Sequence, residues 1–186
     1  MAVTPSTMPP LGTVAKSIVL NDYNGKRWEI NPQKDNSPTL VMFICNHCPY
    51  VKHLFPKMAE ITTEIKKMNI GVYAVNSNDP KQYPEDGVDE MKITAKKYNL
   101  NFPYLVDTTQ EIAKAYTAAC TPDFFLFDNQ GRLYYRGQLD SSRPGSSMPI
   151  NGKDLLNAAT LMCDNQPPPD VQLPSIGCNI KWKPQQ

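Results

Sequence analysis

Apolar residues recur along the chain in two spacings, which predict an alternation of strands and helices. Short runs with the length and the β-branched or aromatic content of buried strands lie at 39–44, 70–75, 102–106 and 124–127. Longer stretches repeat apolar residues every three or four positions, the spacing of one helix face, at 49–68, 88–98 and 154–163. A short helix capped by Thr108 or Thr109 is expected at 109–117. This order predicts right-handed crossovers between parallel strands.

Turn-forming sequences predict antiparallel strands in addition to the parallel ones. Asn24-Gly25 separates 17–20 from 26–30 and predicts a β-hairpin. A second hairpin turn at 128–131 leads into a returning strand at 132–137. We therefore expect a single α/β domain over residues 1–186, with a central mixed sheet flanked by helices. Residues 1–12 are expected to form an N-terminal arm and residues 164–186 a C-terminal tail.

Composition narrows the class of function. The 186 residues carry a formal net charge of +1 without a block of like charge, so neither nucleic acid nor an anionic membrane is an expected partner. No signal-like leader and no run long enough to span a bilayer is present, which favours a cytoplasmic protein. The five cysteines are odd in number and scattered, which indicates resting thiols rather than a disulfide framework.

The candidate chemistry lies where the first buried strand turns into the first long helix, at Cys45-Asn46-His47-Cys48-Pro49-Tyr50. Pro49 suits the first helical position, which makes Cys48 the capping residue. The free amides and the positive end of the helix dipole favour a thiolate over a thiol. A protonated His47 would favour it further. We predict a reactive Cys48 with Cys45 close enough to pair with it.

Two other interpretations of this motif are weaker. A structural zinc site needs four ligands and usually a second closely spaced cysteine pair, whereas Cys120, Cys163 and Cys178 stand alone. Inert buried cysteines are the other alternative. We favour redox chemistry and predict no bound metal and no cofactor.

The element order resembles the thioredoxin fold in its peroxiredoxin-like form. Residues 41–58 align without a gap on the thioredoxin active-site segment, with Cys48 on the attacking cysteine and Val51 in place of the second one. In another register Cys45 attacks and Cys48 resolves. The reactive cysteine of peroxiredoxins is followed by proline, which matches Cys48-Pro49 and favours Cys48 as nucleophile, with Cys45 as its nearest resolving partner.

The same resemblance implies a substrate-binding loop. Thr121-Pro122 matches the cis-proline dipeptide of thioredoxins, which packs against the active-site cysteines. His47, Pro49 and Tyr50 join it as candidate substrate contacts. Cys120, two residues before this proline, and Cys178 in the tail are further candidate resolving thiols.

Longer strings are similar to the peroxiredoxin-like group of the alkyl hydroperoxide reductase and thiol-specific antioxidant (AhpC/TSA) family. They are 45–51, 83–86, 102–105, 121–125 and the tail around Cys178. The chain departs from the peroxidases at two of their three peroxide-binding groups: Pro122 stands where they carry an arginine, and Cys45 where they carry a threonine. Arg143, in a loop, is the candidate substitute for contact with an anion or peroxide.

Three functions follow as hypotheses. The leading one is a thioredoxin-like thiol–disulfide oxidoreductase with an antioxidant or redox role, acting on protein or small-molecule disulfides with thioredoxin or glutathione as reductant. A thiol-dependent peroxidase that reduces hydroperoxides through a sulfenic acid is the first alternative. The second is a copper or zinc carrier that uses Cys45, Cys48 and a histidine.

Overall fold

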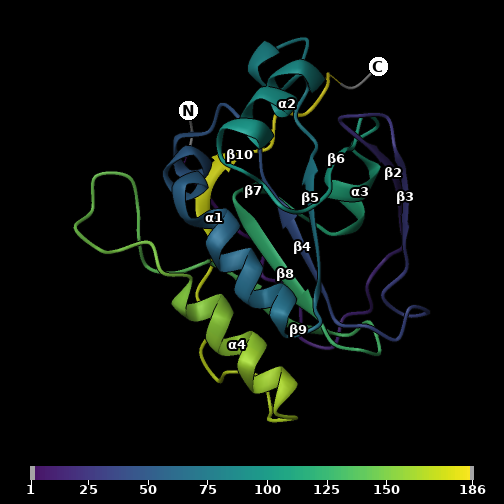
Figure 1. Cartoon of the computed structure of the whole chain (residues 1–186), viewed down its shortest axis with the longest axis vertical. Coiled ribbons are helices and arrows are strands. Elements are labelled where there is room, and N and C mark those ends of the chain that lie inside the picture. Colours follow the sequence, from purple (N-terminus) through teal and green to yellow (C-terminus); the bar gives the residue numbers. More distant parts are fainter. Residues whose placement is uncertain (1–2, 185–186) are drawn as a thin grey trace.

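The computed structural model describes residues 3–184 and is built around a seven-stranded mixed sheet (Figure 1). Its strands are β2 (Ile18–Asp22), β3 (Arg27–Ile30), β4 (Thr39–Phe43), β5 (Gly71–Asn76), β6 (Tyr104–Val106), β8 (Asp123–Phe127) and β9 (Leu133–Gly137). They lie in the order β3-β2-β6-β5-β4-β8-β9. The pairs β4–β5 and β5–β6 are parallel, as the crossovers predicted, and both predicted hairpins, β2–β3 and β8–β9, are antiparallel.

Within residues 3–184, four α-helices flank the sheet: α1 (Pro49–Lys67), α2 (Val88–Lys97), α3 (Glu111–Ala115) and α4 (Lys153–Cys163). Figure 1 shows α1 and α4 side by side across one face. Because side chains alternate along a strand, Leu40 and Met42 of β4 pack toward that face, whereas Val41 and Phe43 join the core on the side of α3. None of the helices within residues 3–184 combines the length and apolar character needed to cross a bilayer.

One helix differs from its prediction. The helix expected at 109–117 is only α3, and its N-cap is Gln110 in the left-handed conformation, not Thr108 or Thr109. Gln110 is held there by its side chain, whose Nε2 donates to the Ser77 and Lys181 carbonyl oxygens. A cap fixed by contacts distant in sequence leaves no signal in the local pattern.

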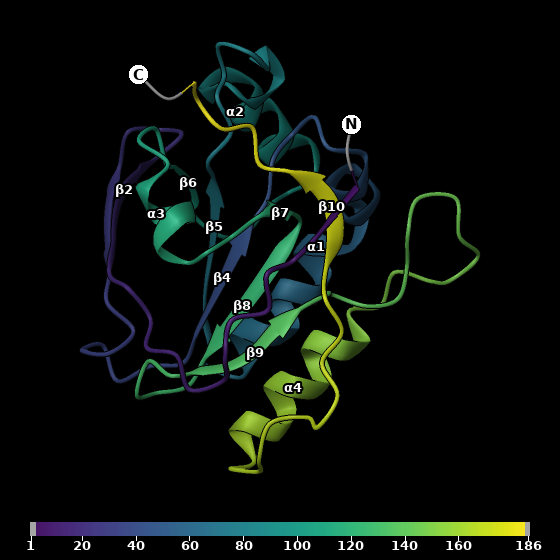
Figure 2. The ribbon, with the colours of Figure 1, turned by 180° about the vertical axis from the view of Figure 1, so that it is seen from behind.

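A second, three-stranded sheet joins both ends of the described chain. It consists of β1 (Val3–Pro5), β10 (Ile176–Asn179) and β7 (Cys120–Thr121), in the order β1-β10-β7 and antiparallel throughout. β10 is the middle strand, and Figure 2 shows it next to the segment labelled β7. The segments expected as an arm and a tail therefore each contribute a strand, and the tail strand lies against the predicted substrate loop.

Candidate active site

Cys48 occupies the predicted place between β4 and α1. It is the N-cap residue in an extended conformation (φ −65°, ψ 124°), and Pro49 is the first helical residue. Among the helix amides, that of Val51 lowers the pKa of Cys48, but the prediction that the helix amides would be its main partners is wrong, because the Cys45 thiol has the larger effect. The sulfur is fully buried, with an exposed fraction of 0%. Its contacts with other thiols set its ionisation.

The surroundings lower the pKa of Cys48 from 9.0 to about 5. The largest cause is a hydrogen bond from the Cys45 thiol, and burial acts in the opposite direction. A hydrogen bond from the Cys178 thiol and the backbone amides of Val51 and Cys178 lower the pKa further. Several donors thus converge on one sulfur, which stabilises its anion.

Cys45 is the complementary partner. Burial and the hydrogen bond to Cys48 raise its pKa well above the ordinary value, so this thiol keeps its proton while Cys48 loses one. The Cys45 Sγ lies 3.1 Å from the Thr121 hydroxyl oxygen, a contact that lowers its pKa in part. The pair therefore combines a thiolate with a neighbouring protonated thiol.

The predicted substrate loop adjoins both sulfurs. The Thr121–Pro122 peptide bond is cis, as predicted. The Cys48 Sγ lies 3.2 Å from the Thr121 carbonyl oxygen, to which its protonated form donates. That contact favours the thiol form, and the donors on the other sides of the sulfur outweigh it.

The remaining predicted thiols differ in position. Cys178 stands opposite Thr121 in the β10–β7 ladder, and burial followed by its hydrogen bond to Cys48 raises its pKa to about 12. Cys120 points its sulfur at the Pro122 carbonyl oxygen, 3.7 Å away, and burial raises its pKa. Of these two candidate resolving thiols, Cys178 has the hydrogen bond to the nucleophile.

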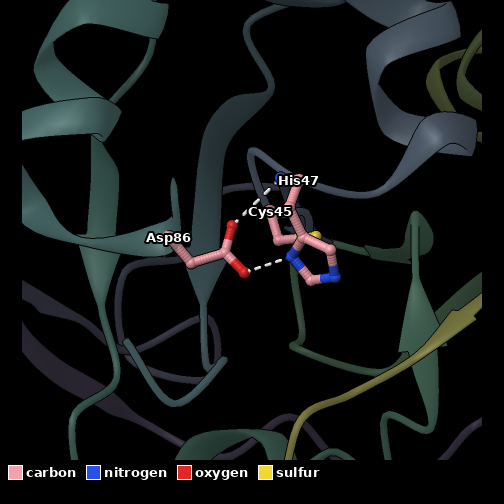
Figure 3. Close-up of side chains that lie close together, drawn as sticks. All are labelled: Cys45, His47 and Asp86. Carbon is pink, nitrogen blue, oxygen red and sulfur yellow. Dashed lines mark hydrogen bonds and ion pairs between the residues drawn. The ribbon is translucent and has the colours of Figure 1, made fainter. Parts of the chain in front are cut away.

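His47 belongs to a buried polar cluster (Figure 3). Its Nδ1 lies 2.5 Å from Asp86 Oδ2, and the backbone amides of Asn46 and His47 donate to Asp86 Oδ1 at 2.7 and 3.2 Å. The Asn78 side chain donates to Oδ2 at 2.7 Å. Burial raises the pKa of Asp86, but the hydrogen bonds from His47 and Asn78 outweigh it and hold the pKa below its ordinary value.

Asp86 is the site residue that sequence reasoning missed. It lies in the string 83–86 that carried the family resemblance, in a short 3₁₀ helix (Pro84–Asp86), yet its local pattern is that of a solvated turn. Its role depends on burial against the loop 44–48, which no periodicity reveals. By fixing two amides of that loop, Asp86 holds the backbone between the two cysteines.

The same cluster contains ligand-type atoms. One atom each from Cys45, His47 and Asp86 lies within 4.8 Å of the others. The Asp86 oxygens already accept hydrogen bonds, whereas His47 Nε2 is buried without a hydrogen-bond partner. The cluster mixes a soft sulfur with a hard carboxylate, a set typical of no single transition metal.

Three of the other predicted residues line one small cavity. Tyr50, Pro122 and Arg143 line a cavity of about 10 Å³, the space of one water molecule, and Pro49 is exposed at the helix start. The Arg143 guanidinium donates to the carbonyl oxygens of Asp140 and Ser142 at 2.8 and 2.6 Å and to the Gln138 side chain. These hydrogen bonds hold the Arg143 side chain against its own loop.

Fold and site together define a thioredoxin-like protein with a paired-cysteine site at a helix start, next to a cis-proline loop. The sequence model of the AhpC/TSA family matches residues 11–136, and the chain belongs to that family. The fold is also that of the thioredoxin domain of a thiol-disulfide oxidoreductase from Bacteroides vulgatus, at 17% identity and a TM-score of 0.58 over 73% of this chain and 90% of that one.

Two further proteins are more similar to this chain in sequence: one is a solved structure described as uncharacterised, and the other is a named oxidoreductase. An uncharacterised conserved protein from Geobacillus kaustophilus superimposes with a TM-score of 0.95 at 43% identity, covering 100% of this chain and 99% of that one. The thiol-disulfide oxidoreductase ResA of Bacillus subtilis is 31% identical over 126 residues, 66% of this chain. This chain spans 64% of the length of that ResA.

Proposed function

We propose that the protein is a thiol–disulfide oxidoreductase in which Cys48 is the nucleophile and Cys45 the resolving thiol. The observation that carries this proposal is the pairing of an anionic Cys48 with a protonated Cys45 in hydrogen-bond contact. The thiolate is the form that attacks a disulfide, and a second thiol is needed to release the product. The name of the Bacillus subtilis relative supports the same chemistry.

The reaction proceeds in two exchanges. The Cys48 thiolate attacks one sulfur of a substrate disulfide, forms a mixed disulfide with it, and releases the other sulfur as a thiolate that takes up a proton. Cys45 then gives up its proton and attacks the Cys48 sulfur, which forms the Cys45–Cys48 disulfide and releases the second substrate thiol. A thiol reductant such as thioredoxin or glutathione restores both cysteines.

Reduction of insulin or of a small disulfide in a thiol-coupled assay tests this function. We expect Cys48→Ser to abolish the activity and Cys45→Ser to accumulate a mixed disulfide with Cys48. Cys163→Ser is the matched control, because Cys163 is exposed at the end of α4, and should retain full activity. Equal activity of Cys48→Ser and the unmodified protein would refute the proposal.

Peroxidase activity is the second candidate, favoured by the hydrogen bond between Cys178 and Cys48, which provides a second thiol that could react with a sulfenic acid on Cys48. Cys48 would be oxidised to a sulfenic acid and then condense with Cys45 or Cys178. Peroxide consumption measured by stopped flow at a rate near that of free cysteine would eliminate this candidate.

The metal carrier is the third candidate, favoured by the proximity of Cys45, His47 and Asp86. Elemental analysis of protein purified without an affinity tag tests it, and less than stoichiometric copper or zinc argues against it. An antioxidant role and a cytoplasmic location remain part of the leading proposal, to be checked by peroxide sensitivity of a deletion strain and by fractionation.

A further inference from the structure

One edge of the seven-stranded sheet is open. The sheet ends at β3, which within residues 3–184 pairs only with β2. Figures 1 and 2 both show the β2–β3 hairpin along one side of the molecule, with no other labelled element outside it. The opposite edge strand, β9, is covered, because the Arg136 amide donates to the Gln172 side chain. An open edge presents backbone amides and carbonyls that another strand can bind.

The hairpin turn determines which backbone groups of β3 face outward. The Asp22 amide donates to the Lys26 carbonyl oxygen at 2.9 Å, so this carbonyl points toward β2. Because the direction of the backbone groups alternates along an antiparallel strand, those of Trp28 also point toward β2. The amides and carbonyls of Arg27 and Glu29 therefore point away from β2, toward the open edge.

The charges on these two residues favour one way of pairing with a second copy. The Arg27 and Glu29 side chains are 66% and 68% exposed and carry opposite charges. When two copies of β3 pair antiparallel about a two-fold axis at Trp28, Arg27 of each copy lies opposite Glu29 of the other. An axis at Arg27 or at Glu29 would instead place like charges opposite each other, which is unfavourable.

We propose that the protein forms a homodimer in which the β3 strands of two copies pair antiparallel about Trp28. Each Arg27–Glu29 pair then exchanges two backbone hydrogen bonds between the copies, in addition to the attraction between its side chains. The contact is the same patch on both copies, as a closed two-fold dimer requires. The two seven-stranded sheets become one continuous sheet.

Trp28 adds an aromatic contact at the centre of this interface. On the axis, the two Trp28 residues form the non-hydrogen-bonded pair, in which opposite side chains lie closest together. The ring is already held within its own copy, edge-on to Tyr73 at 6.0 Å between centroids and with Lys26 Nζ 4.1 Å from its centroid. A ring that is held before association loses little freedom on binding.

The dimer leaves both active sites uncovered. Cys48 follows β4, and β4 is separated from β3 by β2, β6 and β5 in the sheet. The inference therefore concerns association alone and does not depend on the exchange chemistry.

Sedimentation velocity of the full-length protein tests the dimer, with reductant present so that the exposed Cys163 forms no disulfide between copies. Because the paired strands are short, we expect a weak dimer that forms between about 1 and 500 μM protein. Glu29→Arg places arginine opposite arginine at both pairs and should weaken the dimer about tenfold. Arg27→Glu should do the same with two carboxylates.

A matched control makes the same charge change away from the edge. Glu60 on α1 is 67% exposed and pairs with Lys57, so Glu60→Arg should dimerise like the unmodified protein. Because Arg27 and Glu29 are exposed, their substitution should leave stability in urea unchanged. The double variant Arg27→Glu/Glu29→Arg restores opposite charges and should dimerise like the unmodified protein.

A mixture of the two single variants gives the sharpest result. In a mixed dimer of Glu29→Arg with Arg27→Glu, opposite charges face each other at both pairs, so the mixture should dimerise about tenfold more tightly than either variant alone. A protein that stays monomeric over the whole concentration range would overturn the inference. Single variants that dimerise like the unmodified protein, or a mixture no better than its components, would also overturn it.

Discussion

The ionisation of Cys48 depends most on Cys45, and Cys45→Ala tests this directly. A hydrogen bond to a charged group contributes about 1.5–3 kcal/mol. At about 1.4 kcal/mol per pKa unit, its loss should raise the pKa of Cys48 from about 5 to about 6–7. At pH 5.5 the thiolate fraction would then fall from about three quarters to about one tenth, taking a pKa near 6.5.

The pH dependence of Cys48 alkylation measures this pKa, because the thiolate is the reacting form. Burial of Cys48 lowers the rate at every pH, and the midpoint of the profile is the pKa of Cys48 in the folded state, because that state dominates the population. Cys163→Ala serves as control and should keep the midpoint near 5. A midpoint near 9 in the unmodified protein, or an equal midpoint in Cys45→Ala, would refute the reasoning.

Three further predictions follow from the site and the core. Thr121→Val removes the hydroxyl at 3.1 Å that lowers the pKa of Cys45, so the mixed disulfide on Cys48 should persist longer in quenched-flow mass spectrometry, and an equal lifetime contradicts this. Asp86→Asn should cost about 3–5 kcal/mol in urea unfolding at pH 7, because it breaks the buried pair with His47. Because the folded pKa of Asp86 is lowered, its stabilisation is complete above its unfolded pKa of about 4 and is lost as the pH falls through the folded pKa, so the two proteins should converge in acid. Phe55→Ala in α1, whose ring stacks on Tyr98 at 4.9 Å between centroids, should cost about 3–5 kcal/mol by the same measurement, and a loss below about 1 kcal/mol would show that the site collapses around the cavity.

The sequence predicted those parts of the structure that depend on local pattern. The helix at 49–68 and the strand at 39–44 end within one residue of α1 and β4, because an amphipathic face and a buried β-branched run leave a periodic signal. The position of Cys48 at the helix start followed from Pro49. The cis bond at Thr121–Pro122 followed from family resemblance and not from periodicity.

The contacts that set the pKa values in the site could not be predicted from local sequence patterns. The helix amides were expected to ionise Cys48, but its largest stabilising contact is the Cys45 thiol, whose orientation depends on the fold of the loop. The pairing of β10 with β7 joins residues about 58 positions apart, and the burial of Asp86 joins two loops. Long-range pairing of short strands has no signature in a window of ten residues.

The pairing of the two ends of the described chain has a consequence for biosynthesis. During translation, Cys48 leaves the ribosome about 130 residues before Cys178, and Val3 leaves it about 175 residues before Cys178, its partner in β10. The nascent polypeptide therefore carries an unshielded Cys48 until β10 is made, and we expect oxidised glutathione to form a mixed disulfide with Cys48, releasing one reduced glutathione, far faster on stalled ribosomes than on the released protein.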